Sequence, residues 1–285
     1  MEKTKTLALM TVLVLLFMWV GNIVGGAAGT KVAFWAALGT NFVSYFFSDK
    51  MVLSHYNAIE VDSKTSPLLY DIVARLAHRA GLPMPRVYII PEHVPNAFAT
   101  GRSPSHAAVA ATQGLVDLMT PQEIEGVLAH EMSHVRHYDI LISTIAAVFA
   151  GAIVMLGNIA RSGLAGRNGN GRAKSLGVLI AAVLMPLAAT VIRMSISRSR
   201  EFRADEGAAH LTEHPEWLMS ALAKLDDYAA HSNRLANANS QTAHMFIINP
   251  LTATEAMTRI FSTHPSTAER IARLEDIRKG RPAEK

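Results

Sequence analysis

Residues 129–134 read Ala129-His130-Glu131-Met132-Ser133-His134, and the rest of the chain is organised around this stretch. Two histidines four residues apart on a helix lie on one face, so both imidazoles can reach a single metal ion. A glutamate beside them is placed to transfer protons in metal-assisted hydrolysis. The pattern predicts a metal site, provided that the chain supplies a helix here and a third ligand elsewhere.

The composition narrows the classes of protein to which this chain can belong. Of its 285 residues 50% are hydrophobic and 18% are charged, below the roughly 25% typical of soluble proteins, which indicates membrane segments. The absence of cysteine excludes disulfides, thiolate catalysis and cysteine-ligated zinc, so histidine and carboxylate must hold any metal ion. The net charge of +4 arises from basic residues beside apolar runs, with no nucleic-acid motif, so we expect no nucleic-acid partner.

The N-terminal region predicts two membrane-spanning helices. Residues 6–30 carry no charge, and Leu7–Val24 is nearly all apolar, long enough to cross about 30 Å of hydrocarbon. A second uncharged run, Val32–Ser48, follows at once, so the pair is typical of a transmembrane hairpin with a Gly/Ala turn. The alternative is a cleaved signal peptide, given Lys3 and Lys5, although the apolar core exceeds the usual length of about 7–15 residues.

Two further uncharged runs, residues 140–160 and 175–192, predict a second membrane hairpin. The loop between them is basic, so with a cytoplasmic N-terminus it would lie outside, against the positive-inside rule. Either protein contacts help to hold this hairpin in the membrane, or it does not fully cross. In both cases an even number of crossings returns the chain to the membrane face that it left.

The segment between the hairpins predicts a helix and a small amount of β structure. Ser66 as cap, with Pro67 in the first turn, predicts a helix that Gly81-Leu82-Pro83 ends. The run Arg86–Ile90 predicts a short strand, and the small-residue segment Ala107–Thr112 could be the second strand of a hairpin.

Capping signals predict three more helices. The capping box Thr120-Pro121-Gln122-Glu123 begins a helix that must run through His134, so the metal motif is on a helix. Pro215 begins a helix that reaches about His231. A second capping box, Ser266-Thr267-Ala268-Glu269, opens the last helix.

The third metal ligand has to come from another part of the chain. A metzincin needs Gly at position 137 and His at 140, but the sequence has His137 and Ile140, so a carboxylate is the remaining common solution. Glu201 and Asp205, four apart, would share one helix face, Glu201 to bind the metal and Asp205 to orient an imidazole. Alternatively, both acids balance neighbouring arginines: Arg198, Arg200 and Arg203. We expect His137 and Asp139 to be structural, with Asp139 ending the metal helix at the membrane surface.

Several motifs along nearly the whole chain resemble those of one family. In order, they are Asn41, Phe47-Ser48-Asp49-Lys50, Gly81-Leu82-Pro83-Met84-Pro85, Pro95-Asn96-Ala97-Phe98-Ala99-Thr100-Gly101, Leu128-Ala129-His130-Glu131 with His134, Asp139-Ile140-Leu141-Ile142-Ser143-Thr144, Ser197-Arg198-Ser199-Arg200-Glu201-Phe202-Arg203-Ala204-Asp205, Phe246-Ile247-Ile248-Asn249-Pro250-Leu251 and Thr263-His264-Pro265-Ser266. With them the sequence resembles the HtpX-type membrane zinc metalloproteases, relatives of the CAAX prenyl-protein endopeptidases.

The resemblance implies a multi-pass endopeptidase of the bacterial inner membrane whose active site faces the cytoplasm and whose substrates are misfolded or damaged membrane proteins. It implies one zinc ion per subunit on His130, His134 and Glu201, with Glu131 as catalytic base. It also implies that the segment beginning Asn96-Ala97-Phe98 borders the substrate cleft, where a peptide could add as a strand.

The ligands predict the course of peptide hydrolysis. Zinc would activate water and polarise the scissile carbonyl, while Glu131 takes the water proton and delivers it to the leaving amine. Asp205 would hold one ligand imidazole in the required tautomer. The oxyanion partner is left open among His264, Arg200 and a backbone donor, and His264 beside Pro265 is equally a structural loop residue.

We therefore predict a mainly α protein with a small β-hairpin or sheet, integral to the membrane, with two apolar helical hairpins and a gluzincin-like metalloprotease domain. The domains are 1–50, the first hairpin; 51–139, the first protease part; 140–193, the second hairpin; and 194–285, the second protease part.

Two functions of other classes compete with this one. A metal-transporting membrane protein would need His, Asp or Glu within its spans, and the four apolar runs contain none. An inactive scaffold with the same fold would have lost Glu131 or Glu201, and both are present.

Overall fold

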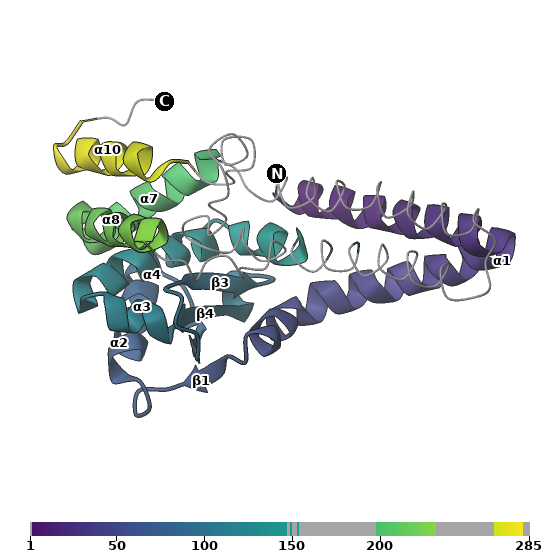
Figure 1. The fold of residues 1–285 in the computed structure, drawn as a ribbon, viewed down its shortest axis with the longest axis horizontal. Helices are drawn as coiled ribbons and strands as arrows, with labels where there is room; N and C mark the ends of the chain where they lie inside the picture. The colour runs from purple at the N-terminus through teal and green to yellow at the C-terminus, as the bar shows by residue number, and fades with distance from the viewer. Residues whose placement is uncertain (1, 147–148, 150–152, 154–197, 232–264, 282–285) are drawn as a thin grey trace. The chain divides into compact units, whose positions relative to one another are not determined.

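The computed structural model describes residues 2–146, 149, 153, 198–231 and 265–281. These residues are mainly helical, with one small four-stranded sheet (Figure 1). The chain divides into two compact units: Met1–Ser48 with Ile142–Ser195, and Asp49–Leu141 with Ile196–Lys285. The prediction of a mainly α protein with a small sheet is confirmed.

Helix α1 (Glu2–His55) doubles back on itself, and Figure 1 shows its two arms side by side. The reversal occurs at Gly26, whose φ of 55° lies in the left-handed region that glycine adopts without a Cβ clash. The side-chain amide of Asn41 donates a hydrogen bond to the carbonyl of Met10 on the other arm, at 3.1 Å. One window, Thr6–Ile23, has the length and hydropathy of a membrane span among the described residues.

The second predicted hairpin lies mostly outside the described residues. Its described part begins with helical residues 140–146 and includes Phe149 and Ile153, both buried. The predicted candidate His264 also lies outside the described residues.

The sheet has the strand order β1-β2-β4-β3. It is built from β1 (Ile59–Val61), β2 (Arg86–Ile90), β3 (Ala97–Gly101) and β4 (Ala107–Thr112). Strand β4 pairs in parallel with β2 and antiparallel with β3, while β1 pairs antiparallel with β2. Strand β3 therefore lies at one end of the sheet.

Strand β3 was not predicted, because the sequence pattern gave no strand for residues 97–101. The expected hairpin strand Ala107–Thr112 does form, and its hairpin partner is β3, joined to it through the short 3₁₀ helix η1 (Pro104–His106). The β3 sequence Ala-Phe-Ala-Thr-Gly has few of the branched and aromatic residues that favour strands. Burial of all five β3 residues replaces the missing local preference, which the sequence alone does not reveal.

Helix α2 (Pro67–Ala80) ends as predicted, at Gly81 in the left-handed conformation with φ of 65°. It also starts as predicted, with Ser66 at the N-cap position and Pro67 in the first turn, but the side chain of Ser66 makes no capping hydrogen bond. The preceding loop is instead organised by Asp62, whose carboxylate accepts hydrogen bonds from the backbone N–H groups of Lys64 and Thr65. The helix thus begins at a loop with its own side-chain turn.

Helix α4 (Pro121–Arg136) begins at the predicted capping box. The hydroxyl of Thr120 accepts from the Glu123 backbone N–H, and the Glu123 carboxylate accepts from the Thr120 backbone N–H. The short helix α3 (Gln113–Leu118) precedes it. The metal motif therefore occupies the last two turns of a well-capped helix.

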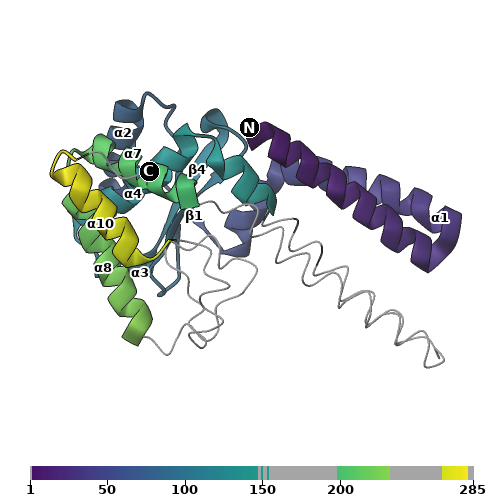
Figure 2. The ribbon, with the colours of Figure 1, turned by 90° about the horizontal axis from the view of Figure 1, so that it is seen from above.

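Three further helices pack around α4: α7 (Arg198–Thr212), α8 (Pro215–His231) and α10 (Thr267–Arg278). A Cβ atom at Gly207 of α7 would collide with the side chain of Ser133, so α7 approaches α4 closely at the metal motif. Helix α10 lies along α8, as Figure 2 shows, and also contacts α7. The predicted starts of α8 at Pro215 and of α10 after Ser266 are confirmed.

The core of the second unit includes α4, α2, α8 and one face of the sheet. Its fully buried members include Leu76, Val127, Leu128 and Leu222. Because α4 is covered on several sides, its polar metal motif is also buried, and such groups must be paired or bind a cation.

The Glu123 carboxylate joins α4 to α8 and predicts an acid-sensitive contact. It accepts hydrogen bonds from Lys224 at 2.7 Å and Ser220 at 2.6 Å. Burial raises the pKa of Glu123, but the bonds from Lys224, Ser220 and Thr120 outweigh burial and lower it to about 2. The depressed pKa stabilises the fold above the ordinary carboxyl pKa of 4.5, and this contribution is lost as pH falls toward about 2.

We expect Glu123→Gln to lower the free energy of unfolding by about 1–2 kcal/mol at pH 7, because the helix cap and the charged hydrogen bonds are weakened. The difference from the unsubstituted protein should shrink as pH falls from 4.5 toward about 2, measured by thermal unfolding in detergent. Glu206→Gln, in an exposed pair with His210, is the control and should change little. If Glu123→Gln lowered the stability by the same amount at every pH in this range, the lowered pKa of Glu123 would not be the source of its stabilising effect.

Candidate metal centre

The two histidines of α4 meet at one point, as their spacing predicts. The Nε2 atoms of His130 and His134 lie 3.2 Å apart, with the two rings perpendicular. His130 is buried and His134 is half-buried. Two imidazole nitrogens converge in the geometry of a shared metal ion.

Glu201 enters the same site from the first turn of α7. Its carboxylate oxygens lie 3.6 Å from Nε2 of His130 and 3.6 Å from Nε2 of His134. The three candidate ligand atoms all fall within 4.8 Å of one another. Tetrahedral zinc with ligands at about 2.0–2.2 Å separates neighbouring ligand atoms by about 3.3–3.6 Å. The donor set and its spacing therefore fit zinc.

The charge of the buried groups also fits a divalent cation. Four carboxylates are buried at the site, against two buried guanidinium groups. The acids are Glu131, Asp139, Glu201 and Asp205, and the bases are Arg200 and Arg270. Among these described groups two negative charges remain when all are ionised and the histidines are neutral. A buried charge requires a partner, and one divalent cation restores neutrality.

Each ligand histidine has a carboxylate on its other ring nitrogen. Nδ1 of His130 lies 2.9 Å from Asp205, as predicted for an orienting acid, and Nδ1 of His134 lies 3.2 Å from Asp139. A carboxylate at Nδ1 fixes the proton there and leaves Nε2 free to bind metal. We expected Asp139 only to end the helix. The chain reverses at Tyr138, whose φ of 62° is left-handed, and this turn returns Asp139 to the metal helix.

Arg270 is a buried site residue that the sequence analysis missed. It is 1% exposed, and its Nε and Nη2 donate to the two oxygens of Asp205 at 2.8 and 2.6 Å. The capping box at Ser266 predicts its helix, but nothing in the local pattern distinguishes Arg270 from a surface arginine. The predicted oxyanion candidate Arg200 is also buried, with Nε 4.0 Å from Asp139.

Glu131 follows His130 directly on α4 and is buried. Its Oε2 accepts a hydrogen bond from the backbone N–H of Ala99 on β3, at 3.0 Å. Burial raises the pKa of Glu131, against the charges of the two histidines. A raised carboxyl pKa suits a group that must take and return a proton near neutral pH.

The ionisation of His130 links metal binding to proton release. Burial lowers the pKa of His130, but hydrogen bonds to Asp205 and Glu201 outweigh it and raise the pKa to about 9. The charge of Arg270 holds the pKa of Asp205 low despite its burial. A metal ion binds the neutral imidazole, so we expect binding at neutral pH to release a proton from His130.

The predicted cleft residues begin strand β3. Asn96 and Ala97 are buried, and the backbone of Asn96 is tied to Thr112 by reciprocal hydrogen bonds. The ring of Phe98 packs against Tyr56, with ring centroids 5.6 Å apart. The same strand donates the Ala99 N–H to Glu131, so Ala97 and Phe98 lie on the strand that contacts α4, and Asn96 directly precedes it.

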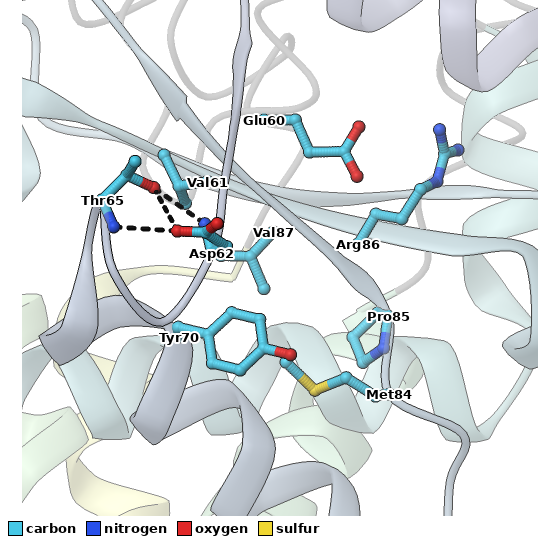
Figure 3. Close-up of a pocket in the computed structure, with 9 residues that line it drawn as sticks. All are labelled: Glu60, Val61, Asp62, Thr65, Tyr70, Met84, Pro85, Arg86 and Val87. Carbon is cyan, nitrogen blue, oxygen red and sulfur yellow. Dashed lines mark hydrogen bonds between the residues drawn. The ribbon is translucent and has the colours of Figure 1, made fainter.

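A pocket of about 490 Å³ beside β1 and β2 has a different lining (Figure 3). Its charged groups are engaged by the protein itself: Asp62 accepts from Thr65, and Arg86 donates to Asp49 at 2.6 Å. Glu60 accepts from a neighbouring tyrosine. None of the predicted site residues lines this pocket, so the metal centre is the stronger functional site in the described part of the chain.

Comparison with known proteins identifies the family. A model of peptidase family M48 matches residues 63–278. A protein named Protease HtpX homolog from Campylobacter hominis is 58% identical over 98% of this chain and 99% of its own length. Proteins of the same name from Campylobacter curvus and Burkholderia mallei are 60% and 51% identical, over 97% and 96% of this chain and 98% and 96% of their own lengths.

A solved structure has a similar fold. The crystal structure of S. mikatae Ste24p matches with a TM-score of 0.52 and 18% identity, covering 95% of this chain and 64% of that one. The family match covers most of the chain, and the resemblance noted from the sequence motifs is confirmed. The chain belongs to peptidase family M48, among its HtpX homologues, and is a zinc metalloendopeptidase.

Proposed function

We propose that this enzyme hydrolyses peptide bonds of misfolded or damaged membrane proteins at the cytoplasmic face of the bacterial inner membrane. The observation that carries the proposal is the gathering of His130, His134 and Glu201 beside the buried carboxylate of Glu131. Membership of a peptidase family supports polypeptides as substrates. Control of damaged membrane proteins during stress is the role that we propose.

The proposed mechanism assigns the metal to His130, His134 and Glu201. When bound, zinc acts as a Lewis acid, which polarises the scissile carbonyl and lowers the pKa of the attacking water. Glu131 takes the proton of the attacking water and passes it to the leaving amine. Asp205 and Asp139 hold the Nδ1 protons of His130 and His134, so each ring keeps its Nε2 directed to the site.

Strand β3 supports a substrate path. Among the described strands it is at the end of the sheet, and the N–H of Ala99 is directed to Glu131 instead of to β4. An extended peptide can add to such an edge through backbone hydrogen bonds. We infer that substrate lies along β3, with Asn96, Ala97 and Phe98 at the cleft. A backbone N–H of this edge is our first candidate for the oxyanion donor, with His264 as the alternative.

We assign residues 1–50 and 140–193 to membrane hairpins, and residues 51–139 with 194–285 to the protease domain. The doubled-back helix α1 and its apolar window support the first hairpin. The division into two compact units falls close to the same boundaries. Both halves of the catalytic site then lie on one side of the membrane.

The proposed function is tested by metal removal from the purified enzyme in detergent. We expect cleavage of an unfolded polypeptide such as casein to stop with a chelator and to return with one zinc ion per chain. Zinc is measured by atomic emission on the same samples, and buffer exchange without chelator is the control. Cleavage that persists in zinc-free protein would contradict the mechanism.

The membrane face is tested with vesicles of known orientation. A chelator that cannot cross the bilayer should inhibit the enzyme in inside-out inner-membrane vesicles and leave it active in intact spheroplasts. Inhibition in spheroplasts alone would place the site on the opposite face.

A further inference from the structure

Arg270 is among the most deeply buried side chains of the described protein, although it lies in the last helix, α10. A buried guanidinium is costly to desolvate, so it persists only where charge and hydrogen bonds compensate it. Its partner Asp205 is 65 positions earlier in the sequence. The tertiary fold therefore brings Arg270 and Asp205 together next to the metal centre.

The contacts of Arg270 run through Asp205 to a metal-ligand histidine. Two guanidinium nitrogens bind the two oxygens of Asp205, the bidentate geometry that fixes a carboxylate plane. The same Oδ1 that accepts from Arg270 lies 2.9 Å from Nδ1 of His130. Nη2 of Arg270 and Nδ1 of His130 are 3.3 Å apart, so both donors converge on one oxygen.

We propose that Arg270 is a positioning residue for the metal centre: it clamps the Asp205 carboxylate against Nδ1 of His130 and so sets the orientation of that ligand. The inference rests on the proposed metal site and deepens it. Removal of Arg270 frees Asp205 to rotate, and His130 then loses the acceptor that fixes its proton at Nδ1.

The other ligand histidine is supported by the same kinds of residue. Nδ1 of His134 lies 3.2 Å from Asp139, and Asp139 lies 4.0 Å from Nε of the buried Arg200. Each imidazole thus has an aspartate, and each aspartate has a buried arginine. The clamp at Asp205 is the tighter of the two, with contacts of 2.6 and 2.8 Å.

A purely structural role is the competing explanation, because Arg270 also anchors α10 to α7. Lysine cannot reproduce a two-pronged bond to a carboxylate, so Arg270→Lys separates charge from geometry. Arg270→Met alone leaves the buried Asp205 carboxylate without its guanidinium partner, a change that destabilises the site. The double variant Arg270→Met with Asp205→Asn removes both charges together and keeps the test possible.

The test measures zinc affinity of the full-length protein by competition with a chromophoric chelator, beside thermal unfolding of the zinc-free form. We expect Arg270→Met and Asp205→Asn each to lower zinc affinity by about 10–100-fold, as loss of an outer partner does. The double variant should be no weaker than Asp205→Asn, since Arg270 acts through Asp205. Arg270→Lys should recover only part of the loss.

Arg273→Met is the matched control on α10. The Arg273 guanidinium stacks on the ring of Phe202, 3.9 Å from the ring centroid. The substitution therefore removes an arginine that joins α10 to α7 and leaves the contacts of Asp205 in place. Zinc affinity should then stay unchanged. Equal zinc affinity in Arg270→Met and Arg273→Met, or additive losses in the double variant, would overturn the inference. Failure of the unsubstituted protein to bind zinc would instead overturn the proposed function.

Discussion

Replacing Glu131 with glutamine is expected to lower kcat for peptide hydrolysis by about a thousandfold, with zinc content unchanged. Glu131 is buried beside the ligand group but is not part of it, because its carboxylate bonds to the N–H of Ala99. Glutamine keeps the size of the side chain and cannot take a proton from water. General-base catalysis contributes about 10²–10⁴-fold, so its loss should appear mainly in kcat.

The measurement is kcat and KM on an unfolded polypeptide, with zinc determined on the same protein. Glu125→Gln is the matched control, since Glu125 is on α4 and equally buried, each being 7% exposed, while its carboxylate pairs with Arg75 at 2.7 Å. We expect the control to keep most of its activity per folded molecule. Equal kcat values for Glu131→Gln and Glu125→Gln would contradict the assignment of Glu131 as the general base.

The part of the site that the sequence predicted depends on short-range signals. The capping box at Thr120 and the spacing of His130 and His134 determine a helix with two ligands on one face. Glu201 and Asp205 share a face for the same reason, once α7 forms. Local periodicity is sufficient wherever the functional residues share one helix.

The residues that the sequence did not predict depend on the tertiary fold. Asp139 reaches His134 through a left-handed turn at Tyr138, a conformation that a non-glycine residue rarely adopts. Arg270 reaches the site from a position 140 residues beyond His130. Strand β3 forms from small residues through burial and pairing with β4. None of these contacts has a period or a cap that a linear pattern could signal.

Glu201→Gln is expected to lower zinc affinity by more than about a hundredfold. Outer partners of metal ligands typically contribute about 10–100-fold, and a ligand itself should contribute more. Both carboxylate oxygens of Glu201 lie 3.6 Å from a ligand nitrogen, so the side chain lies where a third ligand is needed. The substitution also removes one of the buried negative charges that a divalent cation neutralises.

Chelator competition on the purified protein gives the affinity, and proteolysis of the same samples gives the activity. Glu206→Gln is the control, because Glu206 is on α7 but pairs with His210 at the surface. Asp205→Asn, on the same helix, should fall between the two, since it removes only the support of His130. We expect the loss of zinc affinity to increase from Glu206→Gln to Asp205→Asn to Glu201→Gln. This order distinguishes a third ligand from an acid that only lies nearby. A Glu201→Gln protein that binds zinc as tightly as Glu206→Gln would require another third ligand.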